Sequence, residues 1–498
     1  MNIDTKVIEP DLSPVGLKGL FESFVDIVGE SHVLTEKEQL YPYECDGLSA
    51  YKALPLAVVL PATAEEVCEV MRLCHKQNIP VVARGAGTGL SGGALPYEQG
   101  ILLSLARLNQ IINIDPPNRV AVVQPGVRNL AITEAVADLG LYYAPDPSSQ
   151  IACSIGGNVA ENSGGVHCLK YGLTVHNVIH LKVVTIEGEL IEIGGGGLDT
   201  PGYDLLALMH GSEGLLGIIV EVTVKLLPKP DVAVAILASF DDVETAGNAV
   251  ADVISRGILP AGLEMMDNPS IRATEDFVKA GYPIDAAAIL ICELDGTEQE
   301  VKSQIILAKD ILSQAGATEL RISESEQERA KFWSGRKNAF PAVGRISPDY
   351  YCIDGTIPKR ELGNILVEID RLSTEYGLSV ANVFHAGDGN LHPLILYDAN
   401  VDGEFARTEE LGGKILEACV IAGGTITGEH GVGIEKINQM CVQFSSLELE
   451  QFHRIKAAFD PRGLLNPGKA IPTLTRCAEF GGMHVHDGNL PFADIERF

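Results

Sequence analysis

Residues 79–95 read IPVVARGAGTGLSGGAL, in which a β-branched run leads directly into a cluster of glycines. Residues 85–93 contain five glycines, namely Gly85, Gly87, Gly89, Gly92 and Gly93. Glycine has no Cβ, so a cluster of this density predicts backbone that lies directly against a ligand. A plain tight turn is the alternative, but such a turn requires only one or two glycines.

Residues 87–92, GTGLSG, also match the G-x-G-x-x-G fingerprint of dinucleotide-binding proteins. That fingerprint indicates a Rossmann fold only where it opens a helix within a βαβ unit. Here Gly92, Gly93 and Pro96 follow at once, and the next strand-like run, GILLSL, starts at residue 100. Because these residues interrupt a helix, the sequence instead predicts a nest of backbone N–H groups around a pyrophosphate, between two strands.

Two further glycine clusters follow along the chain. Residues 145–165 read PDPSSQIACSIGGNVAENSGG, and residues 210–228 read HGSEGLLGIIVEVTVKLLP. Ser148 and Ser149 offer hydroxyl groups, and the glycines again permit close approach of the backbone. Several phosphate-binding loops in one small region suit a dinucleotide better than a single phosphate.

Composition and charge narrow the class of protein. Lys and Arg number 37 against 67 Asp and Glu, a formal charge of −30, which argues against a nucleic-acid partner. The N-terminal MNIDTKVIEPDLSPVG lacks the features of a secretory signal, and no run of ~18 uncharged apolar residues occurs, so we expect a cytoplasmic protein without a transmembrane segment. The ten cysteines form no C-x-x-C pair, so we expect neither a disulfide framework nor an iron–sulfur cluster held by this chain alone.

The pattern of apolar runs predicts the division into domains. We expect a mostly helical lead-in over residues 1–55 and a glycine-rich domain over 56–228. Residues 229–430 contain three strand–helix–strand units of similar length, which predict a ferredoxin-like α+β substrate domain with helices on one face of its sheet. Residues 431–498 read as a C-terminal helical segment with a turn-rich tail.

Histidines and a carboxylate cluster in two later segments. In VFHAGDGNLHPLIL (383–396), His385 and His392 flank a strong turn signal, so a hairpin would bring both imidazoles to one end. In GGTITGEHGVG (423–433), Glu429 and His430 stand on a glycine-flanked loop. Two histidines and one carboxylate make a three-ligand site for a divalent metal with open positions.

The motifs RGAGTGLSGG, DPSS…GGN…N.GG and GSEGLLG resemble the FAD-binding domain of the vanillyl-alcohol oxidase/p-cresol methylhydroxylase superfamily. The resemblance implies an α+β chain with the two-subdomain FAD-binding domain of the p-cresol methylhydroxylase type, and FAD as cofactor. We expect non-covalent FAD, because the glycine motifs lack a histidine where covalent members link the flavin, and Ile219 is expected near the ring. The residues expected to hold FAD are Arg84, Gly85, Ala86, Gly87, Thr88, Gly89, Leu90, Ser91, Pro145, Asp146, Ser148, Gly156, Gly157, Asn158, Asn162, Gly164, Gly165, Glu213, Gly214 and Ile219.

Both histidine segments resemble the FAD-linked oxidase C-terminal family, whose members oxidise 2-hydroxy acids such as glycolate, D-lactate and D-2-hydroxyglutarate. The resemblance implies that His385, His392 and Glu429 bind a divalent metal (Zn, Mn or Fe) and that His430 is the catalytic base. It also implies an arginine for the substrate carboxylate, for which Arg336 is the first candidate.

Two further interpretations concern arginines and the tail. Arg345 is the second candidate for the carboxylate, and a solvated surface pair of Arg336 with Lys337 is the alternative to any role in binding. His484 and His486 in the tail are interpreted as structural.

The resulting hypothesis is oxidation of glycolate to glyoxylate, and of D-lactate to pyruvate. A hydride would pass from C2 to flavin N5, while the metal holds the substrate and His430 takes the hydroxyl proton. Electrons would leave through flavin-binding and iron–sulfur partner subunits to a quinone-linked acceptor, with association at the inner face of the membrane through those partners. Alternatives are a D-lactate or D-2-hydroxyglutarate dehydrogenase, a non-redox transferase of the alkyl-dihydroxyacetone-phosphate synthase type, and a non-catalytic flavin-binding subunit.

Overall fold

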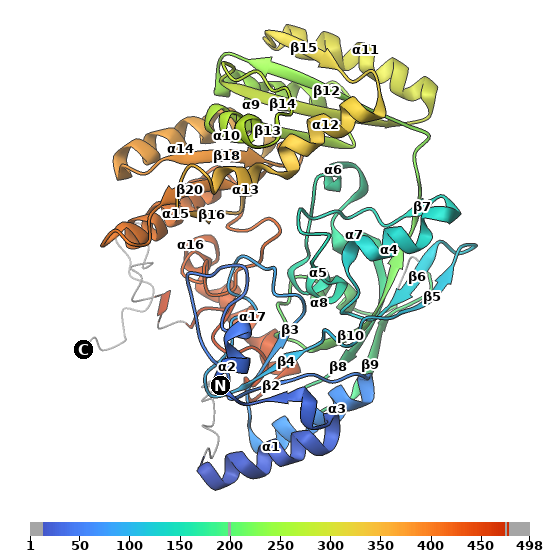
Figure 1. Cartoon of the computed structure of the whole chain (residues 1–498), viewed down its shortest axis with the longest axis vertical. Coiled ribbons are helices and arrows are strands. Elements are labelled where there is room, and N and C mark those ends of the chain that lie inside the picture. Colours follow the sequence, from blue (N-terminus) through green and yellow to red (C-terminus); the bar gives the residue numbers. More distant parts are fainter. Residues whose placement is uncertain (1–12, 198–200, 474–475, 478–498) are drawn as a thin grey trace.

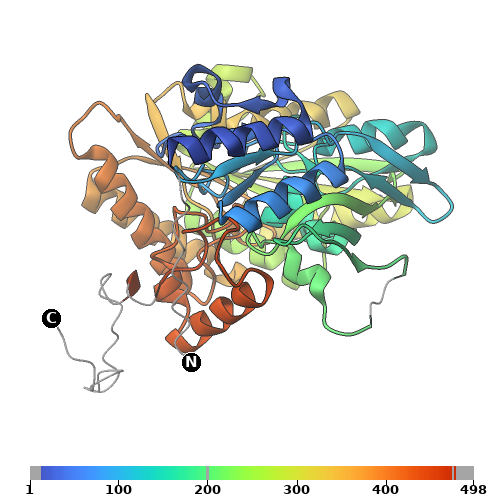
Figure 2. The same cartoon turned by 90° about the horizontal axis from the view of Figure 1, so that it is seen from below.

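The computed structural model describes residues 13–197, 201–473 and 476–477. Its first sheet has four strands, in the order β1 (Val33–Leu34), β2 (Ala57–Val59), β4 (Ile101–Ser104) and β3 (Val81–Arg84). Helix α3 (Ala64–Gln77) links β2 to β3, and it begins where the hydroxyl of Thr63 accepts the N–H of Glu66 at 3.1 Å. Helix α1 (Pro14–Val28) packs beside α3, as Figure 2 shows, and the short α2 (Lys37–Leu40) follows.

The glycine cluster of residues 85–93 lies in the connection between β3 and β4, which are parallel neighbours. Residues 85–100 are all described and contain no helix, so the rejection of a Rossmann fold is confirmed. Gly87 and Gly92 have φ of +72° and +76°, a backbone conformation that side chains rarely adopt. The chain there curls into a loop of exposed backbone groups instead of a helix.

A second sheet of five antiparallel strands completes this half of the chain. Its order is β5 (Ile111–Asp115), β6 (Val120–Val123), β10 (Ile218–Lys225), β8 (Val178–Val184) and β9 (Leu190–Gly194). Short elements surround it, namely α4 (Asn129–Val136), α5 (Ile155–Glu161), α6 (Cys168–Tyr171), α7 (Thr174–Asn177), α8 (Leu205–Met209) and the pair β7 (Leu141–Tyr142) with β11 (Leu227–Pro228). Strand β10 joins the two sheets, because Ile218 and Val220 pack with the first sheet while Val222 packs with the second.

A seven-stranded sheet forms the upper layer of Figure 1. Its order is β15 (Glu319–Ile322), β12 (Val232–Phe240), β14 (Ala288–Gly296), β13 (Gly262–Asp267), β18 (Val380–Phe384), β20 (Pro393–Tyr397) and β16 (Asp349–Cys352). The first four strands interleave two strand–helix–strand units in the ferredoxin-like manner, and the third unit extends the sheet. The short pair β17 (Gly355–Thr356) and β19 (Asn390–Leu391) stands beside it.

Helices cover both faces of this sheet, so the expectation of helices on one face is wrong. Alternate residues of β12 point to different layers: Phe240 packs in one hydrophobic cluster, and Leu237 packs with Phe332 in another. The first layer is α9 (Val243–Ser255), α11 (Glu298–Gln314) and α14 (Leu362–Tyr376), and the second is α10 (Asn268–Val278), α12 (Glu326–Lys337) and α13 (Ala339–Val343). The cause is the nearly continuous apolar character of β12, β13 and β14, which leaves neither face polar.

The C-terminal part returns to the first sheet after α15 (Glu404–Ile421), α16 (Met440–Gln443) and α17 (Ser446–Phe459). Leu465 forms a parallel bridge with Val81 of β3 and is buried in the core of that sheet. A disulfide joins Cys441 to Cys477, a pairing that the cysteine spacing in the sequence did not indicate. The two residues are 36 positions apart in sequence and meet only because the chain reverses direction. The histidines His484 and His486 lie outside the described residues.

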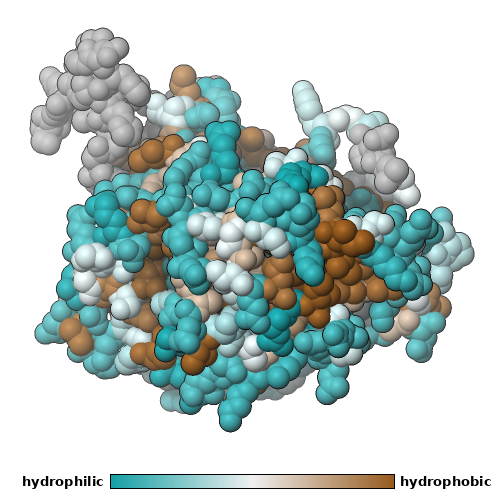
Figure 3. All heavy atoms as spheres, turned by 90° about the horizontal axis from the view of Figure 1, so that it is seen from above, coloured by the Kyte–Doolittle hydropathy of each residue, from teal (hydrophilic) through white to brown (hydrophobic). Residues whose placement is uncertain are grey.

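The outer surface is largely polar where Figure 3 views it, over the end of the molecule that carries α11 and β15 in Figure 1. Hydrophilic side chains cover most of that face, with hydrophobic patches between them. Within the described residues, no helix combines the length and hydropathy required to cross a bilayer.

A partly buried ionic network joins the glycine-rich half to the seven-stranded sheet. The Nδ1 of His167 lies 2.8 Å from Asp146 Oδ2, and its Nε2 lies 3.3 Å from Glu293 Oε1 on β14. Lys170 forms an ion pair with Asp295 of the same strand. Burial opposes the charged form of His167, but the two carboxylates outweigh it and raise the pKa of the imidazole from 6.5 to about 10.

Replacing His167 by glutamine should flatten the dependence of stability on pH. Because the folded pKa lies above the unfolded one, the stabilisation is complete below about pH 6.5 and is lost as the pH rises towards about 10. The free energy of unfolding, measured with urea from pH 6 to 10, should therefore fall by about 2 kcal/mol more in the wild-type protein than in the variant. Equal slopes for the two proteins would contradict this account of the network.

Candidate active site

A cavity of about 400 Å³ opens between the glycine loops and the C-terminal loops. It reaches from Arg84 at the end of β3 to Glu429 and His430. Of the residues predicted to hold the cofactor, those that line this cavity are Arg84, Gly85, Ala86, Gly87, Thr88, Gly89, Leu90, Ser148, Gly156, Gly157, Asn158, Glu213, Gly214 and Ile219.

Glycine is required at several points of the cavity wall. A Cβ added to Gly85 would stand 2.2 Å from the hydroxyl oxygen of Ser154, and one added to Gly156 would stand 2.5 Å from Pro125 Cβ. Gly156 and Gly157 lie in the first turn of α5, capped by Ser154, and not in an irregular loop as the sequence suggested. The close approach that they permit is therefore between α5 and the neighbouring loop as well as towards the cavity.

The other six predicted residues do not line the cavity: Ser91, Pro145, Asp146, Asn162, Gly164 and Gly165. The hydroxyl of Ser91 donates to the carbonyl of His430 at 2.9 Å, which ties the first glycine loop to the histidine loop. Asp146 is engaged by His167, and Asn162 accepts the N–H of Val175. Position 164 has no room for a side chain, because a Cβ added to Gly164 would lie 2.6 Å from Glu429 Oε2 on the opposite wall.

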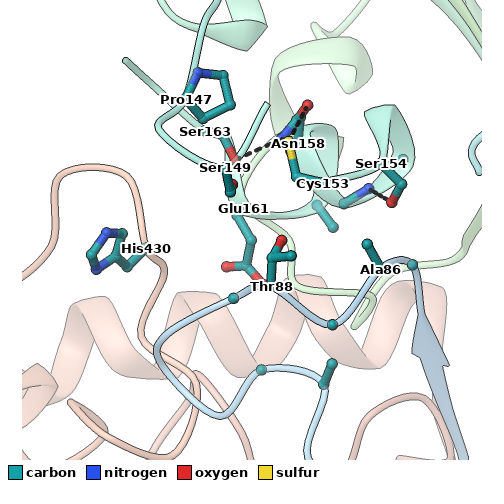
Figure 4. Close-up of a pocket in the computed structure, with 18 of the residues that line it drawn as sticks. Ala86, Thr88, Pro147, Ser149, Cys153, Ser154, Asn158, Glu161, Ser163 and His430 are labelled. Carbon is teal, nitrogen blue, oxygen red and sulfur yellow. Dashed lines mark hydrogen bonds between the residues drawn. The ribbon is translucent and has the colours of Figure 1, made fainter. Parts of the chain in front are cut away.

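Ser149, whose hydroxyl the sequence pointed to, also lines the cavity, whereas Cys153, Ser154, Glu161 and Ser163 line it without having been predicted. Figure 4 shows the serines and Asn158 on one side, His430 on a loop on the other side, and Glu161 extending between them towards Thr88. Ser154 had a local signal, since serine is a preferred N-cap before a helix. Glu161 had none, because its burial depends on segments far away in sequence.

The predicted hairpin is confirmed: β18 and β20 are antiparallel, and His385 bridges to Asn390. It brings the rings of His385 and His392 to a centroid distance of 5.0 Å. Their Nε2 atoms lie 3.3 and 3.0 Å from the same oxygen, Oε1 of Glu429. One ligand atom from each of these three residues lies within 4.8 Å of the others. His430 stacks on His392 at 5.0 Å and 10°, directly beside this group.

Behind His385 stands an ion pair that the sequence did not reveal. Oε1 of Glu264 lies 2.8 Å from His385 Nδ1, and its Oε2 accepts from Arg336 Nε at 2.7 Å. Glu264 and Arg336 each have 1% exposed side chains. A carboxylate on Nδ1 holds the proton there and leaves Nε2 as the free ligand atom, as in many metal sites. The only local signal for Glu264 was an acid within the apolar strand GLEMMD.

The arginine candidates differ sharply in position. Arg336 is buried, so the interpretation as a solvated surface pair is wrong, but it does not line the cavity, whereas its neighbour Lys337 does. The Nη2 atom of Arg336 is buried without a hydrogen-bond partner. Arg345 is half exposed, pairs with Asp276 at 3.3 Å and does not line the cavity, so the structure does not bring this second candidate to the site.

The loop that carries Glu429 and His430 is organised by Asp354. The carboxylate of Asp354 accepts the backbone N–H groups of Gly428, Glu429 and His430 at 2.9–3.3 Å. It also lies 3.3 Å from the ammonium of Lys436, and both side chains are fully buried. Lys436 therefore neutralises a carboxylate that fixes the direction of three successive peptide groups.

The pKa values of His430 and Glu429 on this loop are both lowered, for different reasons. Burial lowers the pKa of His430 to about 4, against the attraction of Asp354. Burial alone would raise the pKa of Glu429, but His385 and His392 lower it well below its usual value. His430 is thus an uncharged imidazole at neutral pH, able to accept a proton, and Glu429 is a carboxylate.

The residues present fit both a dinucleotide and a metal ion. The cavity wall of glycine loops exposes backbone and hydroxyl groups, which suit phosphates. At the other end, Glu429 Oε2, His392 Nδ1 and His430 Nδ1 are buried without hydrogen-bond partners. Buried polar atoms in proteins are nearly always satisfied, so this group is suited to a cation or a polar ligand. Cys352 Sγ forms a second convergent set with His392 and His430.

Comparisons with known proteins agree with this arrangement. The model of an FAD binding domain matches residues 55–194, and the model of the C-terminal domain of FAD linked oxidases matches 229–470. The glycolate oxidase subunit GlcD of Escherichia coli K12 is 67% identical over 94% of this chain and 93% of its own. A D-lactate dehydrogenase of Anaerostipes hadrus is 32% identical over 90% of this chain and 96% of its own.

The fold has relatives among solved structures as well. The substrate-bound crystal structure of p-cresol methylhydroxylase superposes with a TM-score of 0.77 at 20% identity, over 93% of this chain and 98% of that one. The α+β architecture with a p-cresol methylhydroxylase-type FAD-binding fold is therefore confirmed. On the strength of its near full-length identity to GlcD and of both matching domain models, the chain belongs to the family of FAD-linked oxidases that includes the glycolate oxidase GlcD subunits.

Proposed function

We propose that this enzyme oxidises glycolate to glyoxylate, with D-lactate as a second substrate oxidised to pyruvate. The observation that carries the proposal is the shared cavity: the glycine loops line one end, and His392, Glu429 and His430 line the other, with His385 in contact with Glu429. The name of the 67% identical relative supports glycolate as the substrate. We also propose residues 56–228 as the FAD domain, 229–430 as the substrate domain and 431–498 as the C-terminal segment.

Each cofactor would be held by a distinct set of residues. The glycine loops and α5 would hold FAD non-covalently, and FAD supplies the acceptor for a hydride. His385, His392 and Glu429 would hold a divalent metal, which supplies Lewis acidity towards a substrate hydroxyl and carboxylate. Glu264 fixes the tautomer of His385 that this requires.

The remaining steps fall to side chains of the chain. His430 accepts the hydroxyl proton of the substrate at a ring nitrogen, since its low pKa keeps it uncharged beforehand. Asp354 and Lys436 hold the backbone of His430 in place while the charge on the imidazole changes. Arg336 retains a free Nη2, and a substrate carboxylate is the acceptor that this buried atom lacks.

Electron transfer out of the enzyme requires further proteins in this proposal. Because the relative is named a subunit, we infer a complex with flavin-binding and iron–sulfur partners and a quinone-linked acceptor, at the inner face of the membrane. Co-purification of a tagged chain from its native host should recover such partners together with glycolate-dependent quinone reduction. Full quinone reductase activity of the isolated chain would contradict the requirement.

The principal alternatives share the fold and differ in chemistry. A dehydrogenase specific for D-lactate or D-2-hydroxyglutarate would bleach the flavin with that acid and not with glycolate. A transferase of the alkyl-dihydroxyacetone-phosphate synthase type would show no net flavin reduction with any 2-hydroxy acid. The deciding experiment is anaerobic addition of glycolate, D-lactate, L-lactate and D-2-hydroxyglutarate to the purified FAD protein, monitored by flavin absorbance before and after treatment with a chelator.

We expect rapid bleaching by glycolate and D-lactate, little by L-lactate, and loss of bleaching when the chelator removes the metal. Bleaching that survives complete metal removal would rule out the metal in the proposal. No bleaching by glycolate would rule out the substrate. The two failures are therefore separable in one series of measurements.

Replacing Arg336 by lysine should affect the substrate more than the fold. Lysine keeps the charge beside Glu264 but lacks the planar fork of a guanidinium group. It can therefore keep the contact with Glu264 but not the proposed contact with the substrate carboxylate as well. We expect the KM for glycolate to rise by about tenfold or more, in line with one charge-assisted hydrogen bond, while the metal content is retained. Arg329→Lys, on the same helix but outside the cavity, is the matched control. An unchanged KM would remove Arg336 from the substrate site.

A further inference from the structure

A second cavity of about 420 Å³ lies away from the cofactor cavity, between strand β16, helix α15 and residues 435–439. It is as large as many small-molecule binding sites. Four carboxylates line it, from Glu409, Glu410, Glu417 and Glu435, against a single ammonium group from Lys414. The wall therefore favours a cationic ligand, although a group of acidic residues alone does not make a site.

Three of the four carboxylates already have partners. Glu409 accepts the hydroxyl of Tyr51, Glu410 accepts the hydroxyl of Tyr376 at 3.1 Å, and Glu417 pairs with Lys414 at 2.8 Å. Protein groups therefore already satisfy part of the hydrogen-bonding capacity of these three carboxylates. They contribute a negative potential at the mouth of the cavity without requiring a ligand.

Glu435 differs from these three. Its side chain is 2% exposed, and neither of its carboxylate oxygens has a hydrogen-bond partner. The nearest cation, the ammonium of Lys436, lies 3.5 Å from Oε2 and is bound to Asp354 and the carbonyl of Gly431. Leaving a carboxylate buried without hydrogen-bond donors is unfavourable. Burial accordingly raises the pKa of Glu435 to about 7.

The shape of the cavity selects the kind of cation. Among the described residues, convergent sets of three His, Cys, Asp or Glu ligands occur only at the active site, so this cavity does not present a chelating set for a bare metal ion. Ile353 and Leu416 provide apolar wall, and the ring of Tyr351 offers an aromatic surface. A carbon chain with a charged end fits such a mixture better than a hydrated ion does.

We propose that this cavity is a binding site for a small alkylammonium ion, whose N–H groups donate to the free carboxylate oxygens of Glu435 while its methylene chain lies along Ile353 and Leu416. The ligand class is a primary amine or diamine of a few carbons. The site lies behind the loop of Glu429 and His430, because Lys436 separates Glu435 from Asp354. This inference does not depend on the identity of the oxidised substrate.

Isothermal titration of the full FAD-loaded protein with 1,4-diaminobutane, butylamine and 1,4-butanediol tests the proposal. Both amines should bind with a stoichiometry of one, and the diol should not bind. Glu435→Gln keeps the shape and removes the charge, so it should weaken binding of both amines by about tenfold or more. Glu450→Gln, at a half-exposed acid on α17 that pairs with Arg454 outside the cavity, should leave the affinity unchanged.

A second variant guards against a folding defect in Glu435→Gln. Gly413 lines the cavity from within α15, where its Cβ would meet only the flexible amide of Gln439 at 2.8 Å. Gly413→Leu should fill the cavity and abolish amine binding. The variant should still fold, because leucine has a higher helix propensity than glycine. The proposal is overturned if neither amine binds up to about 10 mM, a limit of weak but specific affinity. It is also overturned if folded Gly413→Leu and Glu435→Gln bind as tightly as wild type, or if the diol binds equally.

Discussion

Replacement of His430 by glutamine is expected to lower the rate of flavin reduction by glycolate by about 10³-fold. Glutamine can occupy the same space against His392, but it cannot accept a proton near neutral pH. Burial lowers the pKa of His430 to about 4, so its imidazole is uncharged near neutral pH and has a free nitrogen for the proton in the proposed step. Anaerobic stopped-flow measurement of flavin bleaching reports this step without interference from partner subunits.

Two controls separate the loss of a base from a loss of structure. The His430→Gln protein should keep its FAD spectrum and its metal content, since the residue lies beside the three proposed ligands and is not one of them. His453→Gln, on α17 and outside the cavity, should reduce the flavin at the wild-type rate. A rate for His430→Gln within tenfold of wild type would exclude this histidine as the base.

Replacement of Glu429 by glutamine is expected to remove both the metal and the activity. Oε1 of Glu429 stands between the Nε2 atoms of His385 and His392, and its charge is the only one that the three-residue group offers. Metal catalysis contributes several kcal/mol, so flavin reduction should slow on the order of 10³-fold or more. Metal content by elemental analysis and the bleaching rate should fall together.

The matched comparison for Glu429 is Glu264→Gln. Glu264 orients His385 and pairs with Arg336, and it is not itself a proposed ligand. This variant should therefore lose metal affinity by about 10–100-fold and recover metal binding at high metal concentration. Glu429→Gln should not recover. Full activity of Glu429→Gln after removal of all metal would disprove the proposed ligand role. Retained FAD absorbance in both variants would show that the cofactor loop is intact.

Some of this architecture was predictable because the information is local. The cluster of glycines from Gly85 to Gly93 excludes a helix by backbone propensity alone, and no helix forms there. The turn between His385 and His392 fixes the hairpin, and the structure contains it. The two interleaved strand–helix–strand units were likewise visible in the sequence, as apolar strand-like runs on either side of helix-like segments.

Other features depend on partners distant in sequence and were not predictable. Arg336 meets Glu264, 72 residues earlier, and this contact decides where the guanidinium points. Asp354 and Lys436 are separated by 82 positions and become a pair only when the loop closes. The second helical layer exists because both faces of the sheet are buried. A short apolar run in the sequence does not tell whether one face of a strand is buried or both.

The return of the C-terminal segment to the first sheet has a consequence for how the enzyme is made. Leu465 lies beside Val81, and the amide of Asn466 donates to the carbonyls of Gly93 and Glu213. The nucleotide-binding half is translated first, yet it lacks these contacts until Leu465 and Asn466 have left the ribosome. Stable uptake of flavin should therefore await synthesis of this C-terminal segment, and nascent chains that stop before it should be released empty.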